Sequence, residues 1–156
     1  MRKLITAVVL SVVLGVPSAA CAVRLPTGLW GLQFRPFVVS WTGDGTGFLG
    51  GGTGRRFVTK GDALRRGLRA SFGRLRWTTW NARQGRAWGV NWLDNCIPNC
   101  AQGTYFPKNV NVHVYRPNSS GIFTRLEILS KRNRVQTRRV AMREFGHWVW
   151  DVGDRG

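Results

Sequence analysis

Acidic residues are scarce in this 156-residue chain, which has 7 Asp and Glu against 24 Lys and Arg. Histidine and cysteine are also rare, with two and three copies. A structural zinc site needs four ligands at recognisable spacing, and no histidine stands near the cysteines to complete one. Calcium needs several oxygen ligands, and the glycine-rich turn offers one carboxylate, Asp44. We therefore predict no metal site.

A nucleotide-binding unit is also missing. The stretch Gly45-Thr46-Gly47-Phe48-Leu49-Gly50 contains the letters of the dinucleotide motif. That motif works where a helix begins directly after it, because the amides of the helix then face the pyrophosphate. Here more glycine follows, up to Gly54, and no alternation of strand and helix surrounds it. The sequence therefore predicts no cofactor.

Side chains for catalysis are few. The Gly-x-Ser-x-Gly sequence that exposes a catalytic serine is absent. His113 or His147 beside Asp44 or Asp94 would make a small secreted hydrolase, which stays open as an alternative. Nothing in the sequence joins one of these histidines to one of these carboxylates. We favour a protein without catalysis and predict no catalytic residue.

Long hydrophobic runs are limited to one, residues 4–16, which is shorter than the roughly 20 residues that span a bilayer. Arg2 and Lys3 precede it and small residues follow it, which is the order of a secretory signal peptide. We predict a signal peptide over 1–22 and a secreted or cell-envelope-associated protein without a transmembrane span. Cleavage after Ala20 would instead leave Cys21 as a lipid-modified N-terminus, the alternative for this segment.

The charge is strongly one-sided. The chain carries +17, and +15 remains for residues 23–156 when Arg2 and Lys3 are removed. Such a charge attracts anionic partners, among them acidic envelope polymers, anionic lipid and nucleic acid. Of the 24 basic residues, 20 are Arg, which is also typical of the codon usage of a GC-rich genome. Composition alone does not separate these two origins.

Apolar and polar side chains alternate with a period of two over much of residues 23–156, and turn residues separate the alternating segments. This pattern predicts a single all-β, mainly antiparallel domain, a small sandwich or barrel. Residues 23–33 are expected to be irregular, and 55–72 to be a basic loop with two helical turns capped by Asp62. The expected strands are 34–41, a return strand from 48, 73–80, 87–93, 109–115, 122–129, 134–142 and 147–150.

Cys96 and Cys100 enclose Ile97, Pro98 and Asn99. An exported chain meets oxidising conditions, so we predict a disulfide between them. Closing so short a loop stabilises a protein by about 2 kcal/mol in the chain-entropy model. A protein that presents this loop to a partner, as an interaction or inhibitor protein, is a second alternative for function.

Aromatic residues are the other excess, with 8 Trp. Trp88 and Trp92 share strand parity and are predicted in the core, whereas Trp80 shares parity with Arg74 and Arg76. A tryptophan beside two cations can stack a sugar or a base while the cations hold an acidic group. Arginine stems that simply cover an exposed indole are the plainer interpretation. The predicted binding residues are Arg74, Arg76, Trp80, Arg132, Arg134 and Arg138, of which the last three share parity.

Four separated motifs stand out within residues 34–129: Arg35-Pro36-Phe37-Val38 with Thr42-Gly43-Asp44-Gly45-Thr46-Gly47-Phe48-Leu49-Gly50-Gly51, Trp77-Thr78-Thr79-Trp80, Asn91-Trp92-Leu93-Asp94-Asn95-Cys96, and Cys100-Ala101-Gln102-Gly103-Thr104. With these motifs in this order, the chain resembles a group of small exported proteins of actinobacteria. The resemblance implies export and a compact β domain, and it implies no activity. With the charge and the aromatics, the sequence favours a non-catalytic extracellular module that binds an anionic or saccharide-bearing polymer of the cell envelope, and nucleic acid stays open as a ligand.

Overall fold

The computed structural model describes residues 23–151, so the predicted signal peptide and Cys21 lie outside the described residues. Most of the described chain is antiparallel β-structure, which confirms the predicted all-β class. The elements are β1 Leu25–Pro26, a 3-10 turn Gly28–Trp30, β2 Leu32–Gln33, β3 Val39–Ser40, β4 Gly47–Gly50, β5 Val58–Thr59, α1 Lys60–Arg66, α2 Leu68–Phe72, β6 Arg76–Trp80, β7 Gln84–Asp94, β8 Thr104–Pro117, β9 Phe123–Leu129, β10 Val135–Glu144 and β11 His147–Trp150.

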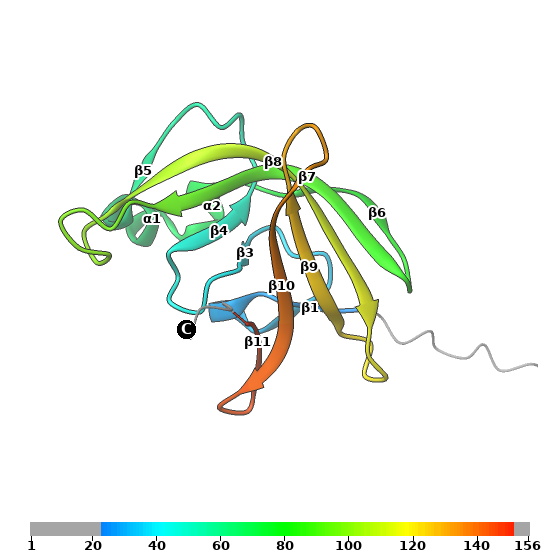
Figure 1. Ribbon diagram of the computed structural model, residues 1–156. Helices are drawn as coiled ribbons and strands as arrows, with labels where there is room; N and C mark the ends of the chain where they lie inside the picture. The colour runs from blue at the N-terminus through cyan, green and yellow to red at the C-terminus, as the bar shows by residue number, and fades with distance from the viewer. Residues whose placement is uncertain (1–22, 152–156) are drawn as a thin grey trace, which may run out of the picture.

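One 9-stranded sheet dominates these residues: seven strands follow the order β11-β10-β9-β8-β7-β4-β3, and β5 and β6 pair beside this path with β8 and β7. Figure 1 shows β7 and β8 arching over the molecule while the sheet curls into a half-barrel. Two strands share one edge of β7: β4 pairs with residues 90–93 of β7, and β6 pairs with residues 85–88. Gly89 of β7 lies between the parts paired with β4 and β6. A Cβ there would lie 2.1 Å from the carbonyl oxygen of Gly50, so only glycine fits.

Two strands also share the edge of β8 that faces away from β7. β5 pairs with Thr104 and Tyr105, and β9 pairs from Asn111 onward. Residues 106–110 therefore have β7 on one side and no strand of the described chain on the other.

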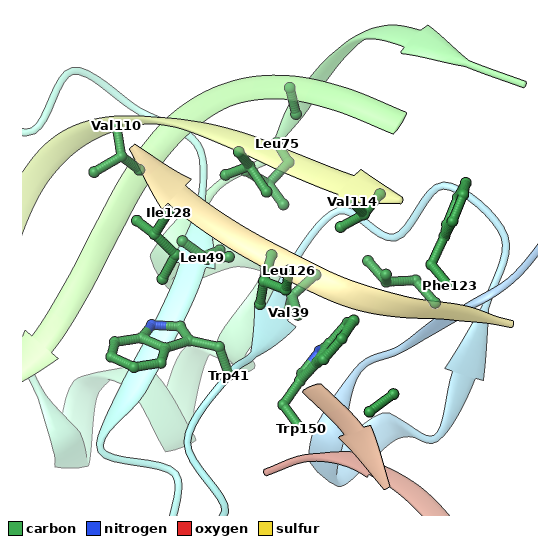
Figure 2. Close-up of a cluster of buried hydrophobic side chains, with 14 of the residues drawn as sticks. Val39, Trp41, Leu49, Leu75, Val110, Val114, Phe123, Leu126, Ile128 and Trp150 are labelled. Atoms are coloured by element: carbon green, nitrogen blue, oxygen red, sulfur yellow. The ribbon is translucent and has the colours of Figure 1, made fainter. Parts of the chain in front are cut away.

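The main core lies on the concave side of the curled sheet. Val110, Val112 and Val114 point into it, as their alternation in the sequence predicts. Leu126 and Ile128 of β9 face them and are fully buried. Figure 2 shows these side chains gathered between the ribbons, with the indoles of Trp41 and Trp150 at the margin of the cluster. The Nε1 of Trp41 donates to the Asn91 side chain at 2.8 Å, so a buried polar pair is satisfied there.

A second, smaller core forms where α1 and α2 cover one end of the sheet on its other side. Phe72 stacks on Phe48 with ring centroids 4.8 Å apart, and both contact Tyr105. The helices fall within the segment that was expected to be mainly loop. Their cap also differs from expectation: the Thr59 side chain accepts from the Asp62 amide at 3.1 Å, so Thr59 caps α1 and Asp62 lies in its first turn.

The N-terminal segment closes the open side of the half-barrel, although residues 23–33 were expected to be irregular. Its two strands pair with each other, and Leu25 is fully buried. Arg24 forms a parallel bridge with Ile122. At the other end of the chain, Trp150 is 2% exposed and its Nε1 donates to the carbonyl oxygen of Pro26 at 2.8 Å. β1 and β11 therefore join the two ends of the described chain.

Most predicted strands form, with different bounds. Residues 34–41 yield only β3, because Pro36 and the following residues run as loop, and 109–115 extends at both ends into β8. Among residues 23–151, no helix combines the length and the apolar character that a bilayer crossing requires.

Candidate functional site

The convex face of β6 to β10, opposite the core of Figure 2, carries rows of side chains that run across the strands. We call it the outer face. Residues directly opposite one another in antiparallel strands have adjacent side chains, so each row is a contact set. The first row is Arg76, Trp88, Asn111, Leu129 and Val135, and the second is Arg86, His113, Glu127 and Arg138.

Trp88 is the exposed aromatic at the centre of the first row. Its side chain is 45% exposed, although its parity with Trp92 predicted a core position. That prediction is wrong because α1 and α2 cover Val90 and Trp92 and stop short of Trp88. The guanidinium of Arg76 lies 5.1 Å from the centroid of the Trp88 ring, within cation-π range.

Two hollows, of about 380 and 750 Å³, meet at Trp88 and Asn111. Together we call them the outer groove. Asparagine amides, cations and a glycine-rich segment line it, and among the described residues no carboxylate does. The lining residues that matter here are Gly52, Thr53, Gly54, Arg55, Arg76, Arg86, Trp88, Asn109, Asn111, His113, Lys131 and Asn133.

Trp80 lies elsewhere, and the prediction that it shares a face with Arg76 is wrong. The register of β6 against β7 shifts between Trp77 and Thr79, which is a β-bulge. The extra residue turns Trp80 to the concave side, where it stands edge-on to Phe123 with centroids 5.4 Å apart. Arg74 precedes β6 and lies over the Phe37 ring at 4.2 Å.

The other three predicted binding residues, Arg132, Arg134 and Arg138, do not lie together on one strand face. Arg132 and Arg134 belong to the turn between β9 and β10 and line neither hollow. Arg138 follows a second bulge, between Val135 and Thr137, which breaks the parity that was expected to join it to them. Of the six predicted binding residues, the structure places Arg76 and Arg138 on the outer face.

Glu127 is an acidic residue of the outer face, and its carboxylate is engaged. Its Oε1 accepts from Arg138 Nε at 3.1 Å and from the hydroxyl of Tyr115 at 3.3 Å. Its Oε2 lies 3.6 Å from Nδ1 of His113. Glu127 is thus neutralised from its own row, and the cations that line the outer groove are left without a carboxylate beside them.

His113 is held as a neutral imidazole at neutral pH. Burial lowers its pKa below the usual value, Arg86 lowers it further, and Glu127 offsets part of this. The contact with Glu127 therefore does not outweigh the effects of burial and Arg86 on the pKa of His113. Nε2 of His113 lies 3.1 Å from the amide oxygen of Gln84, which also accepts from Arg86.

The acids proposed for a hydrolase lie far from His113. Burial raises the pKa of Tyr105 to about 12, with Asp94 and Asp44 adding to it, which places both carboxylates near Tyr105. His113 pairs with Arg86, eight positions along β7 from Asp94, or roughly 26 Å at 3.3 Å per residue. Within residues 23–151, neither histidine has a hydrogen bond or ion pair with Asp44 or Asp94.

Asp44 stabilises its own turn instead, and His147 lies exposed on β11. Burial alone would raise the pKa of Asp44, but hydrogen bonds from the Thr46 hydroxyl at 2.7 Å and the Thr46 amide at 3.0 Å lower it overall. The carboxylate is thereby tied into its own turn. His147 is exposed at the start of β11, opposite Glu144.

Cys96 and Cys100 form the predicted disulfide, with the sulfurs 2.05 Å apart. The loop connects β7 to β8 and begins after Asp94, six residues along β7 from Trp88. Lys60 Nζ donates to the carbonyl oxygen of Cys100 at 2.8 Å, which ties the loop to α1. Ile97 is exposed at its tip.

Sequence reasoning missed Trp88, Asn111, Arg55 and Lys131 as groove residues. The alternation around Trp88 was visible, but the pairing that sets Asn111 beside it depends on the register of two strands. Arg55 and Lys131 lie in loops that carry no periodic signal. Comparison of the chain with protein-family models, with curated proteins and with solved structures finds no match.

Proposed function

We propose that residues 1–22 direct export and that the exported protein is a non-catalytic module which binds an anionic, saccharide-bearing polymer of the cell envelope in the outer groove. One observation carries the proposal. Trp88 is half exposed beneath the guanidinium of Arg76, at the junction of two hollows that no described carboxylate lines.

The chemistry of the groove suits this ligand. An exposed indole offers an apolar face to a sugar ring, and Asn109, Asn111 and Asn133 offer both donors and acceptors to its hydroxyl groups. Lysine and arginine on the same walls attract the acidic groups. A run of stacked bases would call for several aromatic platforms in a row, and the groove has one tryptophan.

Calorimetric titration of the purified protein with soluble polymers tests the proposal. We expect binding of phosphorylated or carboxymethyl dextran, with neutral dextran bound more weakly. Trp88→Ala should weaken binding about tenfold, since aromatic stacking is worth about 1–3 kcal/mol. Phe145→Ala is the matched control, because Phe145 is 94% exposed on the β10–β11 turn, away from the groove.

Equal affinity of the wild type and Trp88→Ala for every polymer would contradict the proposal. Salt-insensitive retention on neutral dextran would contradict its charge-driven part.

A further inference from the structure

The larger hollow of the outer groove has a composition of its own. Arg55, Arg76 and Lys131 line it together, and they come from three separate segments: the loop after β4, strand β6 and the β9–β10 turn. Three cations on different walls face one space of about 750 Å³. Because no described carboxylate lines that space, nothing on its walls offsets their field.

Backbone donors line the same hollow. The segment Gly52-Thr53-Gly54 forms part of its wall, and Gly52 and Gly54 both have positive φ, +102° and +63°. Within residues 23–151, the amides of these three residues donate no hydrogen bond to the protein. Successive free amides in a turn with positive φ make a concavity that suits anions.

The segment packs against a side chain of β8. A Cβ on Gly54 would lie 2.5 Å from Oδ1 of Asn109, so the backbone of Gly54 closely approaches the end of that side chain. Asn109 lines the same hollow, and this contact places the glycine segment beside β8.

From this arrangement we propose that the larger hollow is a subsite for a tetrahedral oxyanion, a phosphate or sulfate group carried by the polymer, with the adjoining sugar on Trp88. This deepens the proposed function and rests on it. A planar carboxylate presents two oxygens in one plane. A phosphate or sulfate group presents oxygens in several directions, so it can accept hydrogen bonds from cations and backbone amides on different walls of the hollow.

The test uses dextrans of equal length and equal degree of substitution that carry phosphate, sulfate or carboxymethyl groups, with unsubstituted dextran as the blank. We expect the phosphate or the sulfate polymer to bind at least about tenfold more tightly than the carboxymethyl polymer, the gain of one or two additional charge-assisted hydrogen bonds. The order of phosphate and sulfate identifies which of the two groups the subsite prefers.

Two matched pairs of variants locate the effect. Arg55→Gln and Lys131→Gln should each remove most of the preference for phosphate or sulfate. Arg56→Gln and Arg132→Gln remove the same charge at the neighbouring positions, which do not line this hollow, and should keep the preference. All four side chains are exposed, so circular dichroism is expected to show the wild-type fold for each variant.

The outcomes separate the two proposals. Equal binding of all three charged dextrans, with loss in Trp88→Ala, overturns the oxyanion subsite and leaves the proposed function standing. Equal loss in Arg55→Gln and Arg56→Gln also overturns the subsite, because net charge alone would then explain the affinity. Tighter binding of oligothymidylate than of phosphorylated dextran, lost in Trp88→Ala, overturns the saccharide part in favour of nucleic acid.

Discussion

His113 lines the smaller hollow of the outer groove, two residues along β8 from Asn111. Its surroundings include both signs of charge: Arg86 on one side and Glu127, itself bound by Arg138, on the other. Burial and Arg86 prevail, so the folded protein disfavours the protonated imidazole. The unfolded chain has no such restraint, and its histidine titrates near pH 6.5.

The pKa shift of His113 predicts a loss of stability on acidification. Because the folded pKa is the lower one, the unfolded state binds more protons as pH falls from about 6.5 through the folded pKa. His113 therefore contributes its full stabilisation above pH 6.5 and loses part of it below. We expect the Tm of the wild type to fall towards that of His113→Gln between pH 7.5 and 5, measured by thermal melts at about half-unit steps.

His113→Asn separates titration from packing, since a packing defect shifts Tm by the same amount at every pH. A difference between wild type and both variants that stays constant, or widens on acidification, would contradict the direction given for the pKa of His113.

At the scale of elements, the closure of the half-barrel depends on β1 and β11. β11 is the edge strand of the curled sheet, and β1 contacts it on the open side, where Leu25 and Trp150 complete the core. Trp150 contributes twice to that closure: its ring fills the core, and its Nε1 satisfies the carbonyl oxygen of Pro26.

Trp150→Ala should therefore lower the free energy of unfolding by about 3–5 kcal/mol, the usual cost of removing a buried large aromatic ring. Trp150→Phe keeps much of the packing and leaves the Pro26 carbonyl without its donor, which costs about 1–3 kcal/mol. Urea unfolding measures both. Trp88→Ala is the control, with an expected cost of about 1 kcal/mol or less, because it loses one cation-π contact on an exposed face. Equal costs for Trp150→Ala and Trp88→Ala would show that β11 does not close the core.

At the scale of the whole molecule, the charge of +15 on residues 23–156 attracts every anionic polymer, whereas the proposed groove contacts affect only a ligand that reaches them. Salt separates the two contributions. Each cation that contacts an acidic group displaces counterions and adds to the slope of log affinity against log salt, and an aromatic contact does not.

Arg76→Gln should lower that slope by about one for phosphorylated dextran. Trp88→Ala should weaken binding at every salt concentration and leave the slope unchanged. Titrations over a series of sodium chloride concentrations measure both, with Phe145→Ala as the variant expected to alter neither. A flattened slope in Trp88→Ala would mean that the indole acts by positioning the cations.

The strands from β7 to β11 follow from the sequence because their alternation is local and each turn carries its own glycine, proline or asparagine. The site does not, for reasons visible at particular residues. The bulge after Trp77 reverses the face of Trp80, and it is set by backbone pairing rather than by side-chain pattern. Trp88 and Trp92 have the same pattern, and only the extent of the helices distinguishes them.

The free stretch of β8, residues 106–110, also bears on how copies of this chain behave toward one another. A bare strand edge is a template on which a second chain can add and begin an aggregate. Here that stretch contains Pro107, which has no N–H to donate, and the exposed Lys108, which brings a charge to the edge. The ring of Phe57 also lies against Phe106, with centroids 5.9 Å apart. Pro107, Lys108 and the Phe57 ring therefore oppose the addition of a second chain at the gap between β5 and β9, so this edge is expected to resist edge-to-edge polymerisation even at high local concentration.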